Sequence, residues 1–148
     1  MCIRDSIYED YEQMLQQQDL EAIFVISSTN QHAEHIIKAL QAGLHVFSEK
    51  PLAITPEACR QVEKVALQHP QQLVVVGFVR RYDPSYRYAK DKVEAGAIGK
   101  PYLVRSQTVD KDTVAEWQIQ YVKTSGGIFH DYNAVSYTHL TLPTTPYV

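Results

Sequence analysis

The fold is decided by residues 22–43, which read AIFVISSTNQHAEHIIKALQAG. The first five residues form a continuous apolar run whose length is typical of a strand that is buried on both faces. Apolar residues then recur at the spacing of one helix face, namely Ala33, Ile36, Ile37 and Leu40. Gly43 follows, as glycine often does where a helix ends. This stretch therefore predicts a strand followed by an amphipathic helix.

The same alternation extends in both directions from this unit. A short helix is expected at residues 8–15, and strands are expected at residues 44–47 and 73–76. The Thr-Pro pair at 55–56 and the Asp-Pro pair at 83–84 predict the starts of two more helices, because Thr and Asp are favoured caps and proline suits the first helical position. Apolar strands that alternate with helices imply an α/β fold, with a parallel sheet covered by helices on both faces.

Residues 102–109 follow a different pattern. The polar side chains Arg105 and Gln107 alternate with their neighbours, which predicts a longer strand with one wetter face. We expect this strand to open a second sheet, antiparallel and part of an α+β domain, with residues 96–100 as the junction.

The composition excludes several classes of function. The chain has 148 residues and a formal net charge of −3, and its longest basic cluster is the pair Arg80-Arg81, so nucleic acid is not expected as a partner. No apolar run approaches the ~20 residues of a membrane span, and no secretory signal opens the chain. Two cysteines, Cys2 and Cys59, make no disulfide framework, which suits a reducing compartment. We therefore expect a cytoplasmic enzyme or ligand-binding module, without a membrane partner.

The two ends of the chain differ in character from the rest. Residues 135–148 are rich in Thr and Pro and contain no acidic or basic residue. Both this end and residues 1–6 resemble translated adapter sequence from the ends of assembly fragments, and we exclude both from the fold assignment. A genuine disordered tail is the alternative. The segment that bears on function is then residues 7–134.

Polar side chains follow three of the predicted strands. Residues 27–30 read SSTN, residues 48–51 read SEKP, and residues 77–81 read GFVRR. Ligands of open α/β sheets bind beyond the carboxyl ends of the strands, so these loops predict a polar ligand pocket. Each loop also has a simpler explanation, which is helix capping for the first, a solvated ion pair for the second and a salt-bridged turn for the third. Their convergence on one sheet edge favours the pocket.

The histidines do not predict a metal site. His32 and His35 lie three positions apart at a helix start and could share a metal ion. No third ligand, cysteine pair or metalloprotease motif accompanies them in the sequence. Asp131, which follows the Gly-Gly turn at 126–127 and lies beside His130, is a stronger candidate for a functional residue.

Five stretches of the chain carry a resemblance to a known family. They read DLEAIFVISSTNQH (19–32), AGLHVFSEKPLA (42–53), GFVRRYDPSY (77–86), GAIGKP (96–101) and SGGIFHD (125–131). In this order they resemble the glucose–fructose oxidoreductase and inositol dehydrogenase family. The Glu-Lys-Pro element at 49–51 is the most specific of these marks, and residues 80–86 resemble the inositol 2-dehydrogenase branch in particular.

The resemblance implies two domains, a cofactor and a type of reaction. Residues 7–96 would form the C-terminal part of a Rossmann dinucleotide-binding domain. Residues 97–134 would begin a C-terminal α+β domain with an open antiparallel sheet, which often forms subunit contacts, so the parent protein is expected to be a homo-oligomer. The implied cofactor is NAD or NADP, and the implied reaction moves a hydride to or from a carbinol carbon of a sugar or polyol. A myo-inositol 2-dehydrogenase is the specific expectation.

The same resemblance implies roles for individual residues. Lys50 matches the catalytic lysine, whose ammonium can donate a hydrogen bond or a proton to the reacting oxygen. Asp131 matches a second catalytic residue, and Lys50, Arg80 and Asp131 would contact the substrate. The residues implied in cofactor binding are Ser27, Thr29, Asn30, His32, Glu49, Lys50 and Pro51. The peptide bond between Lys50 and Pro51 is expected to be cis.

The sequence also departs from the family pattern. It contains no glycine-rich phosphate loop, and the family places this loop and the residue that selects NAD or NADP before position 7. Val135 stands where the family has a histidine four residues after Asp131. We therefore expect an internal fragment that is inactive by itself. A non-catalytic dinucleotide or sugar sensor of the same fold is the alternative, and a small autonomous interaction domain ranks third.

Overall fold

A three-stranded sheet forms the centre of the computed structural model, which describes residues 6–16, 20–103, 105 and 115–127. The strands β1 (Ala22–Val25), β2 (His45–Ser48) and β3 (Val74–Val76) are adjacent in the order β1-β2-β3. Both pairings are parallel, with Ala22 opposite His45 and Val46 opposite Val74. The predicted α/β fold with a parallel sheet is confirmed, and all three strands end at the same edge.

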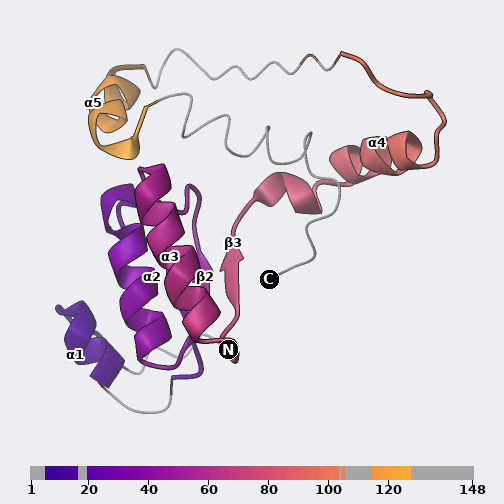
Figure 1. Cartoon of the computed structure of the whole chain (residues 1–148). Coiled ribbons are helices and arrows are strands. Elements are labelled where there is room, and N and C mark those ends of the chain that lie inside the picture. The colour runs from indigo at the N-terminus through magenta and orange to yellow at the C-terminus, as the bar shows by residue number, and fades with distance from the viewer. Residues whose placement is uncertain (1–5, 17–19, 104, 106–114, 128–148) are drawn as a thin grey trace.

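Two helices cover one face of this sheet, as Figure 1 shows. They are α2 (His32–Gln41) and α3 (Pro56–Gln68), which lie side by side and each connect two neighbouring strands. Local signals set the bounds of these helices. Gly43, just beyond the end of α2, has a φ of 82°, a conformation that glycine adopts easily. At the start of α3, Thr55 Oγ1 accepts a hydrogen bond from the Ala58 N–H and so caps the helix. Their inward faces build the core with the strands, which consists of Ile23, Val25, Ile36, Ala39, Leu40, Leu44, Val46 and Val62.

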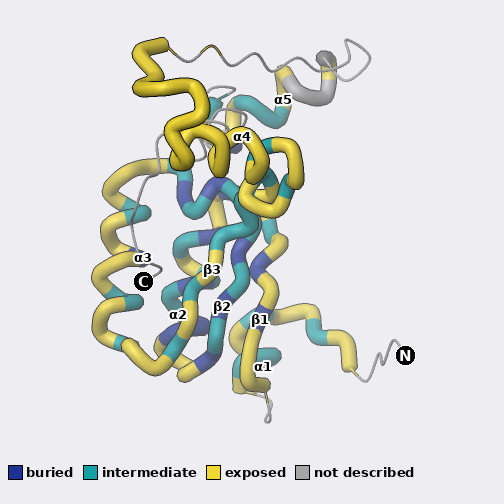
Figure 2. The backbone as a smooth tube through the Cα atoms, turned by 90° about the vertical axis from the view of Figure 1, so that its right-hand side faces the viewer, coloured by how far each residue is buried: buried dark blue, intermediate teal, exposed yellow. Residues whose placement is uncertain are grey.

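The opposite face of the sheet is exposed among the described residues, so the prediction that helices cover both faces is wrong there. Phe24 is 67% exposed and Val75 is 41% exposed, and the rings of Phe24 and Phe47 lie 5.2 Å apart on this face. The reason is the order of the strands. Right-handed crossovers that step in the same direction from β1 to β2 to β3 place both connecting helices on the same face. Figure 2 shows the exposed positions along the strands.

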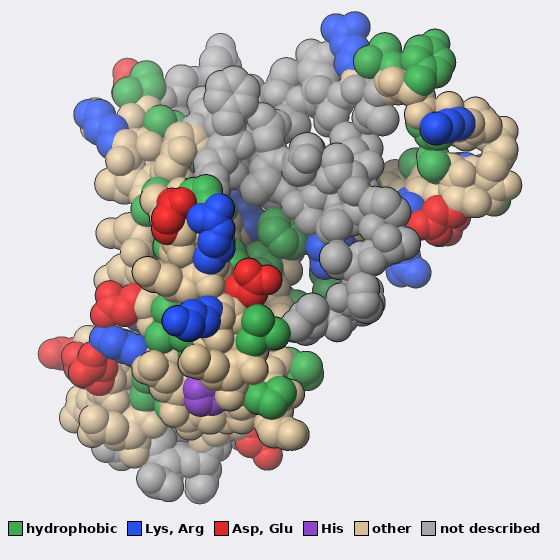
Figure 3. Space-filling model, in the orientation of Figure 1, with side chains coloured by type: hydrophobic (Ala, Val, Ile, Leu, Met, Phe, Trp, Pro, Cys, Tyr) green, Lys and Arg blue, Asp and Glu red, His purple; other side chains and the backbone are tan. Residues whose placement is uncertain are grey.

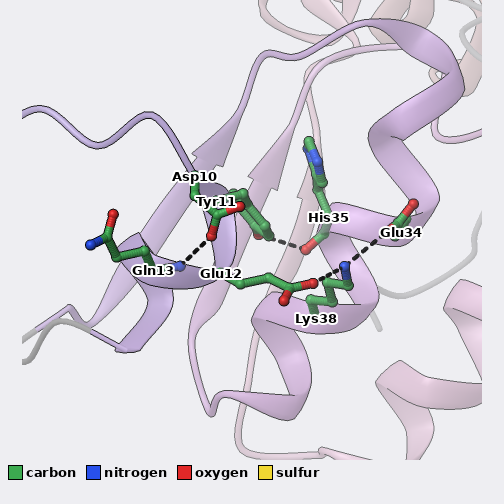
Figure 4. Close-up of polar contacts among 7 residues, drawn as sticks. All are labelled: Asp10, Tyr11, Glu12, Gln13, Glu34, His35 and Lys38. Carbon is green, nitrogen blue, oxygen red and sulfur yellow. Dashed lines mark hydrogen bonds and ion pairs between the residues drawn. The ribbon is translucent and has the colours of Figure 1, made fainter.

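A short helix, α1 (Tyr11–Gln16), packs beside α2 through a compact set of polar contacts. The Tyr11 hydroxyl donates to the His35 carbonyl oxygen over 2.7 Å, and the two rings stack with centroids 4.2 Å apart. Lys38 forms ion pairs with Glu12 of α1 and Glu34 of α2 (Figure 4). These ion pairs raise the pKa of Lys38. Burial raises the pKa of the Tyr11 hydroxyl to about 12, so α1 is held to α2 by a neutral phenol.

The segment after β3 is helical and much less buried. It contains the 3₁₀ turn η2 (Val79–Tyr82), α4 (Pro84–Glu94) and, after an undescribed stretch, α5 (Ala115–Ser125). The Asp83 carboxylate caps α4 as predicted, because its Oδ1 accepts hydrogen bonds from the Ser85 and Tyr86 N–H groups. No residue of α4 is buried, and Tyr86, Ala89 and Val93, which share one face at helical spacing, are half-buried or exposed.

The predicted strand at residues 102–109 is not found in the part of it that the structure describes. Tyr102, Leu103 and Arg105 have no strand conformation, and the remaining positions lie outside the described residues. The division of the chain at residues 96–97 therefore stays a prediction. Within the described ranges, no helix is both long and apolar enough to cross a membrane. Figure 3 shows positive and negative side chains interspersed over the outer face of the helices that cover the sheet.

Candidate functional site

The three loops singled out in the sequence leave the sheet at the same edge. Hydrogen bonds continue the ladder just beyond the strands, from the Glu49 N–H to the Val25 carbonyl over 3.0 Å and from the Gly77 N–H to the Ser48 carbonyl over 2.8 Å. The starts of the loops after β1, β2 and β3 are therefore fixed in register with one another. The structure brings together the polar strand ends at the edge where parallel sheets bind ligands.

The loop after β1 does not cap the following helix with its side chains. Ser28 precedes the 3₁₀ turn η1 (Thr29–Gln31) and makes no side-chain cap hydrogen bond, and the same holds for Gln31 at the start of α2. Ser28 and Asn30 are exposed. The capping explanation of this Ser-Thr-Asn sequence is therefore not what the structure shows. The hydroxyl and the amide face solvent at a helix start, where backbone N–H groups favour anions.

Helix α5 reaches this loop from a distant part of the sequence. Thr29 is 4% exposed, and its hydroxyl lies 2.9 Å from the Tyr121 hydroxyl, 92 positions later in the chain. Ser125 at the end of α5 is fully buried, and its hydroxyl has no hydrogen-bond partner among the residues that the structure describes. Figures 1 and 2 both show α5 above the carboxyl edge of the sheet. Sequence reasoning missed Tyr121, because one tyrosine on a helix carries no local sign of such a contact.

The loop after β2 holds the Glu-Lys-Pro element in a tight arrangement. The buried Ser48 hydroxyl donates to the Glu49 carbonyl oxygen over 3.0 Å, and the Glu49 carboxylate accepts from the Lys50 N–H over 3.1 Å. Pro51 is buried, Lys50 is half-buried, and the peptide between them is cis, as the resemblance implies. The backbone thus fixes Lys50 at the end of β2.

Gly77 permits this arrangement by its lack of a side chain. A Cβ atom at position 77 would lie 3.0 Å from the Phe47 ring and 3.5 Å from Glu49 Oε1. A larger residue would press on the Phe47 ring and come into contact with the Glu49 carboxylate, so glycine allows β2 and β3 to approach at their carboxyl ends without a shift of the ring. The glycine that follows the third strand therefore belongs to the site as well as to the fold.

The arginines after β3 match their simpler explanation in part. Arg80 forms an ion pair with Asp83 at 3.3 Å, and its guanidinium lies 5.1 Å from the centre of the Tyr86 ring. Hydrogen bonds from the backbone N–H of Ser85, together with Arg80, hold the pKa of the Asp83 carboxyl below its ordinary value. Arg80 is half-exposed, and its ion pair with Asp83 holds the guanidinium near the carboxyl edge of the sheet.

The two histidines of α2 make their polar contacts within the protein. His32 Nδ1 lies 2.8 Å from the Pro51 carbonyl oxygen, and its Nε2 lies 3.0 Å from the Ser27 carbonyl oxygen. His35 Nδ1 lies 2.9 Å from the Ser27 hydroxyl, and burial lowers the pKa of His35. The described residues contain no group of three or more His, Cys, Asp or Glu side chains that could hold a metal ion.

The second expected catalytic residue, Asp131, lies outside the described residues. Two shallow hollows lie in other parts of the described surface, one of about 270 Å³ between α1 and α2 and one of about 280 Å³ between the end of η2 and α4. None of the site residues expected from the sequence lines either hollow. The geometry that bears on function is therefore the carboxyl edge of the sheet with its three loops and α5.

Comparison with known proteins identifies the family of this chain. The oxidoreductase family Gfo/Idh/MocA, which has an NAD-binding Rossmann fold, matches residues 3–78. This chain belongs to the Gfo/Idh/MocA family. The predicted Rossmann architecture and family resemblance are thereby confirmed.

Among individual proteins, several members of the Gfo/Idh/MocA family are similar to the chain. The inositol 2-dehydrogenase of Salmonella typhimurium is 34% identical over 111 residues, which are 75% of this chain and 33% of that protein. The solved myo-inositol 2-dehydrogenase of Lactobacillus plantarum has a TM-score of 0.84 at 38% identity, over 90% of this chain and 40% of its own. The scyllo-inositol dehydrogenase of Lactobacillus casei, with bound NAD(H) and scyllo-inositol, has a TM-score of 0.81 at 37% identity, covering 89% and 39%. The chain thus spans about a third of the length of the curated relatives it matches.

Proposed function

We propose that this chain contributes the cofactor edge and a catalytic lysine to an NAD- or NADP-dependent dehydrogenase that acts on a sugar or polyol. A myo-inositol 2-dehydrogenase is the specific proposal. The observation that carries it is the position of Lys50, which lies two residues after the end of β2, in the middle one of three loops that carry polar side chains at the carboxyl edge. The similarity to inositol dehydrogenases and the solved relative with bound NAD(H) and scyllo-inositol support the same substrate class.

The residues of the edge fit a dinucleotide. Ser28 and Asn30 are exposed at and just after the start of η1, and Ser28 makes no side-chain capping bond, so their polar side chains face the solvent where a ligand could reach them. We assign cofactor contacts to Ser27, Thr29 and Asn30 in this loop. Glu49, Lys50 and Pro51 follow β2 and would line the cofactor beside them. His32, which the resemblance also implies in cofactor binding, is not assigned one, because it is buried with both ring nitrogens on backbone carbonyl oxygens. When bound, the nicotinamide supplies the acceptor or donor of the hydride.

Lys50 has the chemistry that such a reaction needs from the protein. Oxidation of an alcohol removes a hydride from carbon and a proton from oxygen, and an ammonium or amine beside that oxygen can hold it and move the proton. Lys50 is half-buried on a rigid strand end, which is where a proton-transfer group must be held in position. Arg80 and Asp131 are proposed to bind the substrate hydroxyls, and Asp131 is proposed as a second catalytic residue.

Substitution of Lys50 tests the proposed chemistry. We expect Lys50→Met, introduced into the complete reading frame that carries residues 20–127, to lower kcat for NAD(P)-dependent oxidation of myo-inositol by about 10²–10⁴-fold. The KM for the dinucleotide should change much less. Lys64→Met on the exposed side of α3 is the matched control and should behave as the unsubstituted enzyme. A Lys50→Met enzyme with unchanged turnover would contradict the catalytic role.

The same enzyme separates a dehydrogenase from a sensor. Asn30→Ala should raise the Kd for the dinucleotide, measured by fluorescence titration, because its amide lies on the exposed loop after β1. A sensor would bind dinucleotide or inositol yet show no turnover with NAD or NADP and any inositol isomer. Reduction of one of the two cofactors at a rate above the enzyme-free rate would exclude the sensor and identify the preferred dinucleotide.

A further inference from the structure

A buried histidine connects the two loops that carry the proposed cofactor and catalytic residues. His32 is the first residue of α2 and is 2% exposed. Its Nδ1 lies 2.8 Å from the carbonyl oxygen of Pro51, the residue after Lys50, and its Nε2 lies 3.0 Å from the carbonyl oxygen of Ser27. The ring therefore spans the space between the loop after β1 and the loop after β2.

The chemistry of these contacts gives the ring a specific role. Both partners are backbone carbonyl oxygens, which can only accept, so each contact needs an N–H of the imidazole. A neutral ring donates to one of the two oxygens, and a doubly protonated ring donates to both. Since both ring nitrogens face the protein and the side chain is buried, His32 presents no polar atom to a cofactor or substrate.

We propose that His32 is a positioning residue that sets the distance between the cofactor loop and Lys50. The inference rests on the proposed function, because it assumes that the first loop holds the dinucleotide and the second carries the proton-transfer group. His35, one turn later, supports the first link, since its Nδ1 lies 2.9 Å from the Ser27 hydroxyl. The first turn of α2 thus holds Ser27 through two side chains and the Lys50 loop through one.

Hydride transfer makes this distance important. A proton-transfer group and a cofactor that sit on different loops must be held together to a fraction of an ångström, and a misplacement of about 1 Å can cost on the order of 10²-fold in rate. The β1 and β2 strands fix where the loops begin, whereas His32 connects them beyond the last ladder hydrogen bond. Loss of the ring would free the loops without removing any group that touches a ligand.

Two substitutions that each imitate one ring nitrogen test the proposal in the complete reading frame. The amide nitrogen of His32→Asn lies near the place of Nδ1, so this variant places a donor toward Pro51 and leaves no side-chain nitrogen beside the Ser27 carbonyl oxygen. His32→Gln places its amide nitrogen near Nε2 and does the reverse. We expect His32→Asn mainly to raise the KM for the dinucleotide and His32→Gln mainly to lower kcat, each about 10-fold. His69→Asn and His69→Gln, at the end of α3 on the opposite edge of the sheet, are the matched controls and should change neither constant.

A role in folding alone predicts a different result. The proposal would be overturned if both variants showed the same fall in kcat and the same rise in KM, in proportion to the fall in their melting temperatures. It would also be overturned if kcat and KM were unchanged in both variants. A second measurement needs no substitution and uses the 148-residue chain itself. A His32 ring proton bonded to a buried carbonyl should exchange slowly with solvent in ¹⁵N-edited NMR spectra, and rapid exchange of every ring proton would also overturn the proposal.

The two measurements separate this inference from the proposed function. If the complete reading frame oxidises no inositol isomer with either cofactor, the proposed function fails, and the kinetic arm of the test fails with it. The NMR arm then still decides whether His32 connects the two loops. A protected ring proton together with the split between the two variants would establish the positioning role.

Discussion

The sheet layer and the helices that follow it are built on different principles. Among the described residues, every buried hydrophobic side chain lies between Ile23 and Val62, in the layer formed by β1, β2, α2 and α3. Helix α4 has caps as good as those of α3 but no buried residue. Local signals are therefore enough to form a helix. Burial is what fixes a helix against the rest of the molecule and supplies most of its stability.

Core truncation should give the largest difference between the two regions. Leu40 of α2 is fully buried, so Leu40→Ala should lower the free energy of unfolding by about 2–5 kcal/mol. Val93 of α4 is 39% exposed, and Val93→Ala should cost only about 0.5 kcal/mol. Urea unfolding followed by circular dichroism measures both. Similar losses in the two variants would mean that α4 is packed as firmly as the sheet layer.

Removal of the helix caps should also distinguish α3 from α4, with a smaller change in stability than core truncation. Thr55→Ala and Asp83→Ala each remove one side-chain cap, a change that costs about 1 kcal/mol of helix stability. We expect Thr55→Ala to lower the global free energy of unfolding by about that amount, because α3 is part of the core layer. Asp83→Ala should instead speed amide hydrogen exchange in α4 alone.

Asp83→Asn provides the control for this pair, because asparagine is also a good cap. It should keep the exchange rates of α4 near those of the unsubstituted chain. If Asp83→Ala lowered the global free energy of unfolding as much as Thr55→Ala, α4 would unfold together with the sheet layer. The two regions would then not differ in stability.

The contact between α1 and α2 should make stability depend on pH at both ends of the scale. Burial raises the pKa of Tyr11 from 10.0 to about 12, so the folded form keeps its phenol neutral when the unfolded chain has lost the proton. This contribution is present below pH 10 and is lost as the pH rises toward 12. Burial also lowers the pKa of His35, so stability falls as the pH drops below about 6.5, where the unfolded chain takes up a proton first.

The substitution Tyr11→Phe tests whether Tyr11 causes the loss of stability at alkaline pH. The variant loses the hydrogen bond to the His35 carbonyl at every pH, yet its stability should no longer fall between pH 10 and pH 12 as steeply as that of the unsubstituted chain. Chemical unfolding at a series of pH values measures the difference. An unchanged slope in this range would assign the alkaline loss to other groups.

Capping and periodicity predicted much of the fold correctly because both act over a few residues. Thr55 and Asp83 cap the helices that they were expected to start, and Gly43 follows the helix that the apolar spacing predicted. The predicted strand is not found at Tyr102, Leu103 and Arg105, because alternation of polar and apolar residues cannot by itself supply the neighbouring strand that a ladder needs; the other positions of 102–109 lie outside the described residues.

The candidate site shows the same division. The positions of Glu49, Lys50 and Arg80 at strand ends followed from apolar runs and the residues after them. The contacts of His32 did not, because the sequence places a polar ring at a helix start without saying whether it meets a ligand or a carbonyl oxygen. The contact between the Thr29 and Tyr121 hydroxyls could not be predicted either, because nothing in the sequence near one residue indicates the other.

The sequence by itself determined the alternation of strands and helices, the caps and the polar residues at the three strand ends, because each follows from spacing along the chain. Only the tertiary structure decided that α2 and α3 share one face of the sheet, which follows from the order and handedness of the crossovers. It also decided that the His32 ring lies between the carbonyl oxygens of two loops and that α5 reaches the first of them. Contacts of this kind depend on how distant segments meet in space, and that is set by the packing of the whole layer.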